Sequence, residues 1–193
     1  MRKTSQQQRQ HIIDATDTLL YQKGFHHMSF SDIAQAAGLS KGNLYYYFKT
    51  KEEVLSSVIS NRVEKVKQML ELWDKEIQHP LDRLKRYAQV PVIEIENVLQ
   101  YGCPMGSLNT ELAKSQPELQ KITRQQFDVF KEWIKKQFQV LSPDKDAEEL
   151  SVHLLVLLQG ISIVSQTYAD RAIITREVDK VLSWLEELAR GAD

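Results

Sequence analysis

The sequence predicts an all-α protein with a small N-terminal domain, residues 1–50, and a larger C-terminal domain, residues 51–193. Three observations favour this fold class. The 193 residues include only seven glycines and five prolines. Apolar side chains recur at helical spacing along most of the chain, and no clear alternating pattern of the kind typical of half-buried strands is present. Capping residues also stand directly before several of these apolar runs.

The first helix is predicted over residues 5–23. Its apolar side chains fall on one face, at Ile12, Ile13, Leu19 and Leu20. Gly24 is expected to close this helix. This helix and the two that follow are expected to form a three-helix N-terminal domain. Its core is thin, so the domain needs the fourth helix of the chain as support.

The segment after residue 28 has the features of a helix-turn-helix. Ser29 can cap a helix, with Asp32 three residues further on in a capping-box arrangement. Gly38 can adopt the left-handed conformation that ends this helix. Ser40 can then cap a second short helix over residues 41–48, with Leu44 on its inner face. In a helix-turn-helix the second helix lies in the major groove of DNA.

The run GLSKGNLYYYFKTKEEVL, residues 38–55, resembles the signature of the TetR family of transcriptional regulators, and residues 25–55 match that pattern nearly throughout. The resemblance implies a helix-turn-helix DNA-binding domain, a C-terminal helical ligand-binding and dimerisation domain, and a DNA-binding regulator, most often a repressor. It also implies a palindromic operator and release from that operator by a small-molecule effector. Beyond residue 55 the likeness is limited to helical layout and length, so effector identity does not carry over.

Helical geometry selects the candidate DNA contacts. With Leu44 and Phe48 inward, Asn43 can read a base edge, while tyrosine rings and hydroxyls can contact bases or phosphate. Serines at helix starts suit phosphate, and two lysines suit the DNA backbone. The predicted DNA-binding residues are Ser29, Ser31, Ser40, Lys41, Gly42, Asn43, Tyr45, Tyr46, Lys49 and Lys51. Each tyrosine of the run could instead be a packing residue, Tyr47 above all.

A long helix is predicted from a second capping box, Thr50 with Glu53, to about Gln78. At 1.5 Å per residue it would be about 40 Å long. No Gly/Ser linker separates it from the N-terminal domain. We therefore expect it to act as a lever that carries movement of the C-terminal domain to the DNA-binding helices.

The last two predicted helices cover residues 148–169 and 175–190. The first is apolar nearly all round, and the second carries one clean apolar stripe. Pairing with the same helices of a second chain is one way to bury both, and the family resemblance implies such a four-helix homodimer. Gly160, with Ser162 and Ser165 nearby, would allow close approach. The alternative is that both helices complete the core of a monomer.

The resemblance also implies an effector cavity in the C-terminal domain. An aromatic, weakly charged set of side chains suits a mostly apolar small molecule. The predicted pocket residues are Trp73, Tyr87, Tyr101, Cys103, Met105, Asn109, Phe127, Phe130, Trp133, His153 and Gln159. The aromatic members could equally be plain core, and the polar members satisfied buried groups. Cys103 lies in a turn near a helix start, where a thiolate is favoured, so a sensor of oxidants or electrophiles is an alternative function.

Composition limits the remaining possibilities. Residues 1–51 contain seven Lys/Arg and three acids, against 18 and 23 in the rest, so a basic N-terminal domain suited to phosphate precedes an acidic one. One cysteine and no secretory or membrane-spanning segment indicate a cytoplasmic protein. No catalytic motif, metal site or cofactor site is indicated, so we expect no enzyme. The rival functions are an effector-independent DNA-binding protein, an activator, or a helical enzyme or carrier that uses the cavity of the C-terminal domain.

Overall fold

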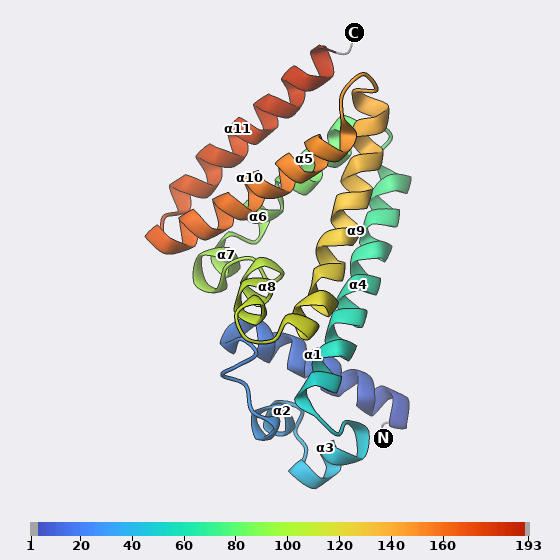
Figure 1. Cartoon of the computed structure of the whole chain (residues 1–193), viewed down its shortest axis with the longest axis vertical. Helices are drawn as coiled ribbons and strands as arrows, with labels where there is room; N and C mark the ends of the chain where they lie inside the picture. Colours follow the sequence, from blue (N-terminus) through green and yellow to red (C-terminus); the bar gives the residue numbers. More distant parts are fainter. Residues whose placement is uncertain (1–3, 192–193) are drawn as a thin grey trace. The chain divides into compact units, whose positions relative to one another are not determined.

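A computed structural model of the chain describes residues 4–191, and all of their regular secondary structure is helical (Figure 1). This confirms the predicted fold class. The helices are α1 Ser5–Lys23, α2 Phe30–Ala36, α3 Lys41–Tyr47, α4 Lys51–Glu76, α5 Pro80–Ala88, α6 Val90–Ile93, α7 Ile95–Tyr101, α8 Gly106–Ala113, α9 Pro117–Leu141, α10 Ala147–Tyr168 and α11 Arg171–Arg190.

The described chain forms two compact units, and their division differs from a single break at residue 50. The first unit comprises the residues up to Lys65 together with Ser107–Gln126, and the second comprises Val66–Gly106 and the residues from Phe127 onward. The first turns of α4 join the first unit because Val54, Leu55, Val58 and Ile59 are fully buried in its core. Helices α4 and α9 each contribute residues to both units.

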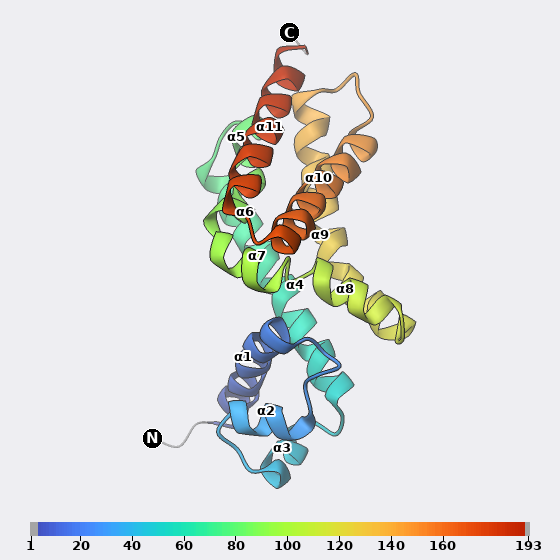
Figure 2. The same ribbon diagram turned by 90° about the vertical axis from the view of Figure 1, so that its left-hand side faces the viewer.

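The core of the first unit contains most of the side chains predicted from the sequence. Ile12, Phe25, Ile33 and Leu44 are fully buried in it, whereas Leu19 is only partly buried at its edge. Two contributions come from α8, far along the chain, as Leu108 and Leu112 insert into the same core. Figure 2 shows α1, α2 and α3 of this unit.

Polar pairs also fasten α1 to α4 within the first unit. The Arg62 guanidinium lies 2.6 Å from the Asp17 carboxylate, and the Lys65 ammonium lies 3.0 Å from Asp14. Gln10 donates to Asn61 Oδ1 at 3.1 Å. The three α4 partners all lie within about one helical turn, at residues 61–65, and they hold this part of α4 against α1.

The second unit is built around α10 and α11, which lie side by side in both views (Figures 1 and 2). Helix α11 begins at Arg171, four residues before the predicted start, because the Asp170 carboxylate accepts a hydrogen bond from the Ala172 N–H at 2.8 Å and caps it. Helix α10 ends at Tyr168, and Ala169 takes the left-handed conformation, with φ of 49°.

Among the described residues, none covers one side of α10. Val152, Val156, Ile163 and Val164 are exposed there, together with Tyr168. Helix α10 is long and apolar enough to cross a membrane on length and composition alone, a test that the core helix of a soluble protein also passes. The exposed side is therefore an apolar surface, of the kind that is normally buried by packing against another surface.

Candidate nucleic-acid interface and effector region

Reciprocal hydrogen bonds fix the start of α2. The Asp32 N–H donates to Ser29 Oγ at 3.1 Å, while the Ser29 N–H and hydroxyl donate to the Asp32 carboxylate at 2.8 and 2.6 Å. These bonds to Ser29 are the main reason that the pKa of Asp32 lies below its usual value. Gly38 then ends the helix with φ of 64°, a conformation that side-chain-bearing residues rarely adopt. The predicted helix-turn-helix geometry is present.

Helix α3 presents one buried and one exposed side. Ser40 Oγ accepts a hydrogen bond from the Asn43 N–H at 3.2 Å and caps the helix. Leu44 is fully buried and Phe48 nearly so, which fixes the rotation of the helix. The exposed residues on and beside α3 are Ser40, Lys41, Gly42, Asn43, Tyr45, Tyr46 and Lys49, and Ser29 and Ser31 are exposed at the start of α2.

The tyrosines of α3 differ in their surroundings. Tyr46 is 74% exposed, and its ring meets that of Tyr47 edge-on at 5.0 Å. Tyr45 packs on the ring of Phe30 from α2 at 4.6 Å, which holds it in one orientation while leaving it exposed. Tyr47 is half-buried, as its place nearer the inner face predicted.

The two predicted backbone-binding lysines are placed differently. The exposed Lys49 ammonium donates to the Tyr45 carbonyl at 2.6 Å and retains further N–H donors. The half-buried Lys51 ammonium donates to the Phe25 carbonyl at 2.9 Å and lies 4.1 Å from the centre of the Phe25 ring. Lys51 therefore braces the turn before α2, a role the sequence pattern does not reveal.

Sequence reasoning also missed Glu111. From α8, its carboxylate accepts hydrogen bonds from the backbone N–H groups of Phe25 and His26 at 3.0 and 2.7 Å. Gly24 has φ of 76°, which favours glycine, and a Cβ atom there would lie 2.8 Å from the Glu111 carboxylate, which would have to shift. A separation of 85 residues hides this contact from any local pattern.

Four of the predicted pocket residues form an aromatic cluster in the second unit. Trp73 of α4, Tyr87 of α5, and Phe130 and Trp133 of α9 are all buried. The Tyr87 ring lies 5.0 Å from that of Phe130, and the Trp73 ring lies 5.9 Å from that of Trp133. Burial raises the pKa of the Tyr87 hydroxyl, and the nearby Cys103 contributes to that rise.

Cys103 and Gln159 also come together, across 56 residues of sequence. The Gln159 side-chain amide donates to Cys103 Sγ at 3.4 Å, and the Gly106 N–H donates to the same sulfur at 3.5 Å. A side chain at Gly106 would clash with Gln159. Met105 packs against the hydrophobic core that contains the aromatic cluster.

Asn109 and His153 do not join this group, whereas Phe127 packs against the same hydrophobic core as the aromatic cluster. Asn109 lies in the first unit, where it accepts a hydrogen bond from the Thr123 hydroxyl at 3.0 Å. His153 is exposed on α10, with its ring 5.1 Å from that of Trp184. Tyr101 and Phe127 are half-buried in the second unit.

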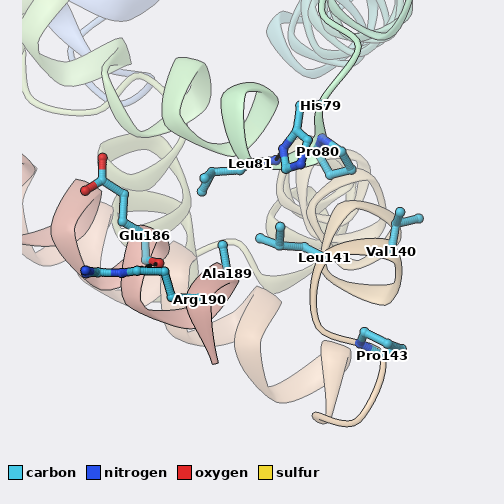
Figure 3. Close-up of a pocket in the computed structure, with 9 residues that line it drawn as sticks. All are labelled: His79, Pro80, Leu81, Val140, Leu141, Pro143, Glu186, Ala189 and Arg190. Atoms are coloured by element: carbon cyan, nitrogen blue, oxygen red, sulfur yellow. Dashed lines mark hydrogen bonds between the residues drawn. The ribbon is translucent and has the colours of Figure 1, made fainter. Parts of the chain in front are cut away.

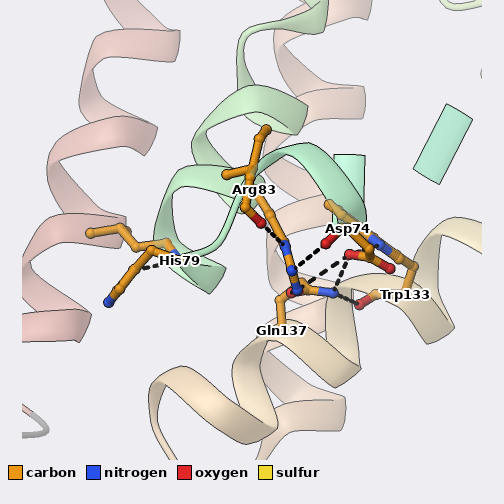
Figure 4. Close-up of polar contacts among 7 residues, drawn as sticks. Asp74, His79, Arg83, Trp133 and Gln137 are labelled. Carbon is orange, nitrogen blue, oxygen red and sulfur yellow. Dashed lines mark hydrogen bonds and ion pairs between the residues drawn. The ribbon is translucent and has the colours of Figure 1, made fainter. Parts of the chain in front are cut away.

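A polar cluster at the end of α4 accompanies the aromatic one (Figure 4). The Arg83 guanidinium donates to the backbone carbonyls of Asp74 and Ile77, both at 2.7 Å, and to Gln137 Oε1 at 3.1 Å. The Trp133 indole N–H donates to the Asp74 carboxylate at 3.1 Å. Arg83 of α5 thus satisfies free carbonyls at the C-terminal end of α4 and links that end to α9.

The fold and the capped, outward-facing α3 agree with comparisons to known proteins. Residues 12–58 match the family described as "Bacterial regulatory proteins, tetR family". An uncharacterized HTH-type transcriptional regulator from Lactococcus lactis is 26% identical over 92% of each chain. The HTH-type transcriptional repressor DhaR from a Mycobacterium species is 27% identical over 66% of this chain and 62% of its own. A TetR-family regulator from Agrobacterium tumefaciens has the same fold, with a TM-score of 0.82 at 18% identity over 93% of this chain and 98% of its own.

The chain is therefore a helix-turn-helix transcriptional regulator. It belongs to the TetR family, whose members bind DNA as dimers and respond to small molecules. These regulators are DNA-binding proteins and not enzymes.

Proposed function

We propose that this regulator is a repressor that binds a palindromic operator as a homodimer and leaves it when a small molecule binds. The observation that carries the proposal is the exposed side of α3, held in one orientation by the Ser40 cap and the buried Leu44. The relative DhaR is named a repressor, which supports repression over activation. Competition between operator and random DNA at physiological salt tests specific binding. Equal affinities would favour the effector-independent DNA-binding protein.

The exposed residues divide by role. Asn43, Tyr45 and Tyr46 are proposed to contact bases, since they combine exposure with groups that donate, accept or stack. The proposed contacts to the DNA backbone are Ser31, Ser40, Lys41, Gly42 and Lys49. Ser29 and Lys51 are proposed to position these contacts, because the Ser29 hydroxyl is bonded to Asp32 and the Lys51 ammonium to Phe25.

The proposed dimer forms through α10 and α11. It is supported by the exposed apolar residues of α10 and by Gly160, where an added Cβ atom would meet no neighbouring atom within 4 Å. Ser162 and Ser165 do not contribute as expected, because both are buried and donate to carbonyls of their own helix. Val156→Glu would place a charge in this surface. Sedimentation equilibrium should show a monomer for this variant, and an unchanged dimer would exclude this face.

The effector is proposed to act through the aromatic cluster beside α4. Because Trp73 and Trp133 belong to it, a bound molecule that separates their rings should change tryptophan fluorescence. We propose that residues 51–193 bind effector and dimerise, that residues 1–50 bind DNA, and that α4 links the two activities in a cytoplasmic protein. Compounds found by fluorescence are then titrated against operator binding. If all of them leave operator affinity unchanged, the coupling is wrong.

A second candidate trigger is oxidation or alkylation of Cys103. It is favoured by the partial exposure of Cys103, a free cysteine, and by the two hydrogen bonds that hold its sulfur in one place. Mass spectrometry after mild peroxide or maleimide treatment of the folded protein tests it. An unmodified Cys103 would leave the small-molecule effector as the trigger.

A further inference from the structure

A hollow of about 680 Å³ in the second unit has a lining that includes no residue of the aromatic cluster (Figure 3). It opens between the start of α5, the end of α9 and the end of α11. Most of its lining is apolar: Pro80, Leu81, Val140, Leu141, Pro143 and Ala189. Its volume falls within the range of roughly 300–1,000 Å³ that small-molecule sites occupy. None of the residues that line it was expected to bind a ligand.

The charged groups of the lining stand together on one side, where Figure 3 shows Glu186 and Arg190 on α11. Glu186 is already neutralised, since its carboxylate lies 2.6 Å from the Lys85 ammonium. That pairing is the main reason for a lowered pKa of Glu186.

Arg190 differs from Glu186 in its bonding. Its Nε donates only a long bond, 3.4 Å, to the Glu186 carbonyl, and within residues 4–191 it forms no direct ion pair with a carboxylate. Glu186, Lys85 and Arg190 together therefore carry one net positive charge beside an apolar lining.

We infer that this hollow binds a small amphipathic carboxylate, with its hydrocarbon chain against the apolar lining and its head group on the Arg190 guanidinium. Guanidinium and carboxylate form charge-assisted, often bidentate, hydrogen bonds. An apolar chain gains by leaving water along the lining formed by Leu81, Leu141 and Ala189. This binding does not depend on the proposed repressor function, and it can be measured without DNA.

The test is equilibrium dialysis of the full-length protein against radiolabelled decanoate, below the concentration at which decanoate forms micelles. One saturable site per chain is expected. Decanol, which has the same chain without the charge, should bind at least about tenfold more weakly. Arg190→Gln should weaken decanoate binding about tenfold. Arg176→Gln, on the exposed side of the same helix beside Glu177, is the matched control and should bind normally.

Ala189→Phe fills the hollow and should abolish decanoate binding while helicity and melting temperature stay unchanged. If it fails to fold, Arg190→Gln still decides the matter, because Arg190 is exposed. No saturable binding, or wild-type binding by Arg190→Gln, would overturn the inference. A changed oligomeric state of Arg190→Gln in sedimentation velocity, with decanoate binding intact, would show instead that a second copy covers the hollow.

Discussion

Asn43 and Lys49 are both exposed on the proposed DNA-binding side of the first unit, but they should contribute to binding differently. Asn43→Ala should lower affinity for the operator and leave affinity for random DNA nearly unchanged, because base contacts specify and phosphate contacts do not. Lys49→Ala should weaken binding to all sequences and lower the slope of log affinity against log salt by about one. Fluorescence anisotropy at several salt concentrations measures both effects. Equal losses on operator and random DNA for Asn43→Ala would contradict its base-reading role.

Asp32 predicts a specific pH dependence of stability. Its pKa is lowered in the folded state, chiefly by hydrogen bonds from Ser29, so the carboxylate stabilises the fold above its unfolded pKa of about 3.9. That stabilisation is lost as pH falls through the lower folded pKa. As the pH falls below about 4, the melting temperature of the wild type should therefore fall more steeply than that of Asp32→Asn. If the melting temperatures of the two proteins fall in parallel with pH, ionisation of Asp32 does not contribute to stability.

Contacts between neighbours in sequence were the ones that could be predicted at the residue scale. The Ser29–Asp32 and Ser40–Asn43 caps span three residues, and local pattern is enough to find them. The contacts of Glu111 and Lys51 with residues near Phe25 depend on chain folding over 85 and 26 residues, so no periodicity reveals them. The bond from Lys51 to Phe25 was not expected, because in the sequence a lysine near α3 is indistinguishable from Lys49 until its partner is seen.

Among the elements, the end of α4 is fixed chiefly by one side chain from α5. Arg83→Met would remove the donors to the carbonyls of Asp74 and Ile77 and leave the Asp74 carboxylate without its cation. We expect a loss of about 2 kcal/mol in the free energy of unfolding, since the lost hydrogen bonds come from a charged, partly buried group. Urea unfolding followed by circular dichroism measures it.

Arg83→Lys and Arg176→Met are the controls for this prediction. Lysine keeps the charge but cannot reach three acceptors with a planar fork, so most of the loss should remain. Arg176 is exposed on α11, and its replacement should change stability by less than about 0.5 kcal/mol. A loss for Arg83→Met no greater than that for Arg176→Met would show that the polar cluster does not hold α4.

Most helices were predictable because their ends are marked by capping residues, glycines and prolines that can be recognised within a few residues of sequence. Pro80, Pro91 and Pro117 stand in the first turn of α5, α6 and α9, as proline favours. The start of α11 was placed too late, although Ile174 in its first turn is fully buried, because the capping role of Asp170 was not taken into account. The effector region was the least predictable, since Asn109 and His153 share a helical pattern with the core but lie elsewhere in the fold.

At the scale of the whole molecule, the two units carry different features. The first presents an exposed α3, and the second presents the uncovered apolar side of α10. Two-fold pairing of α10 and α11 would give the protein two α3 helices, and a dimeric helix-turn-helix protein binds half-sites whose symmetry mirrors its own. Two copies of α3 are therefore expected to read an inverted repeat in the operator.

Selection of bound duplexes from a random DNA library, followed by sequencing, tests that claim most directly. The wild-type protein should enrich an inverted repeat whose half-site centres lie about 10 base pairs, or a multiple of that, apart. Asn43→Ala should relax the preference at the same position of both half-sites. Enrichment of a single asymmetric site, or of no sequence at all, would contradict the claim.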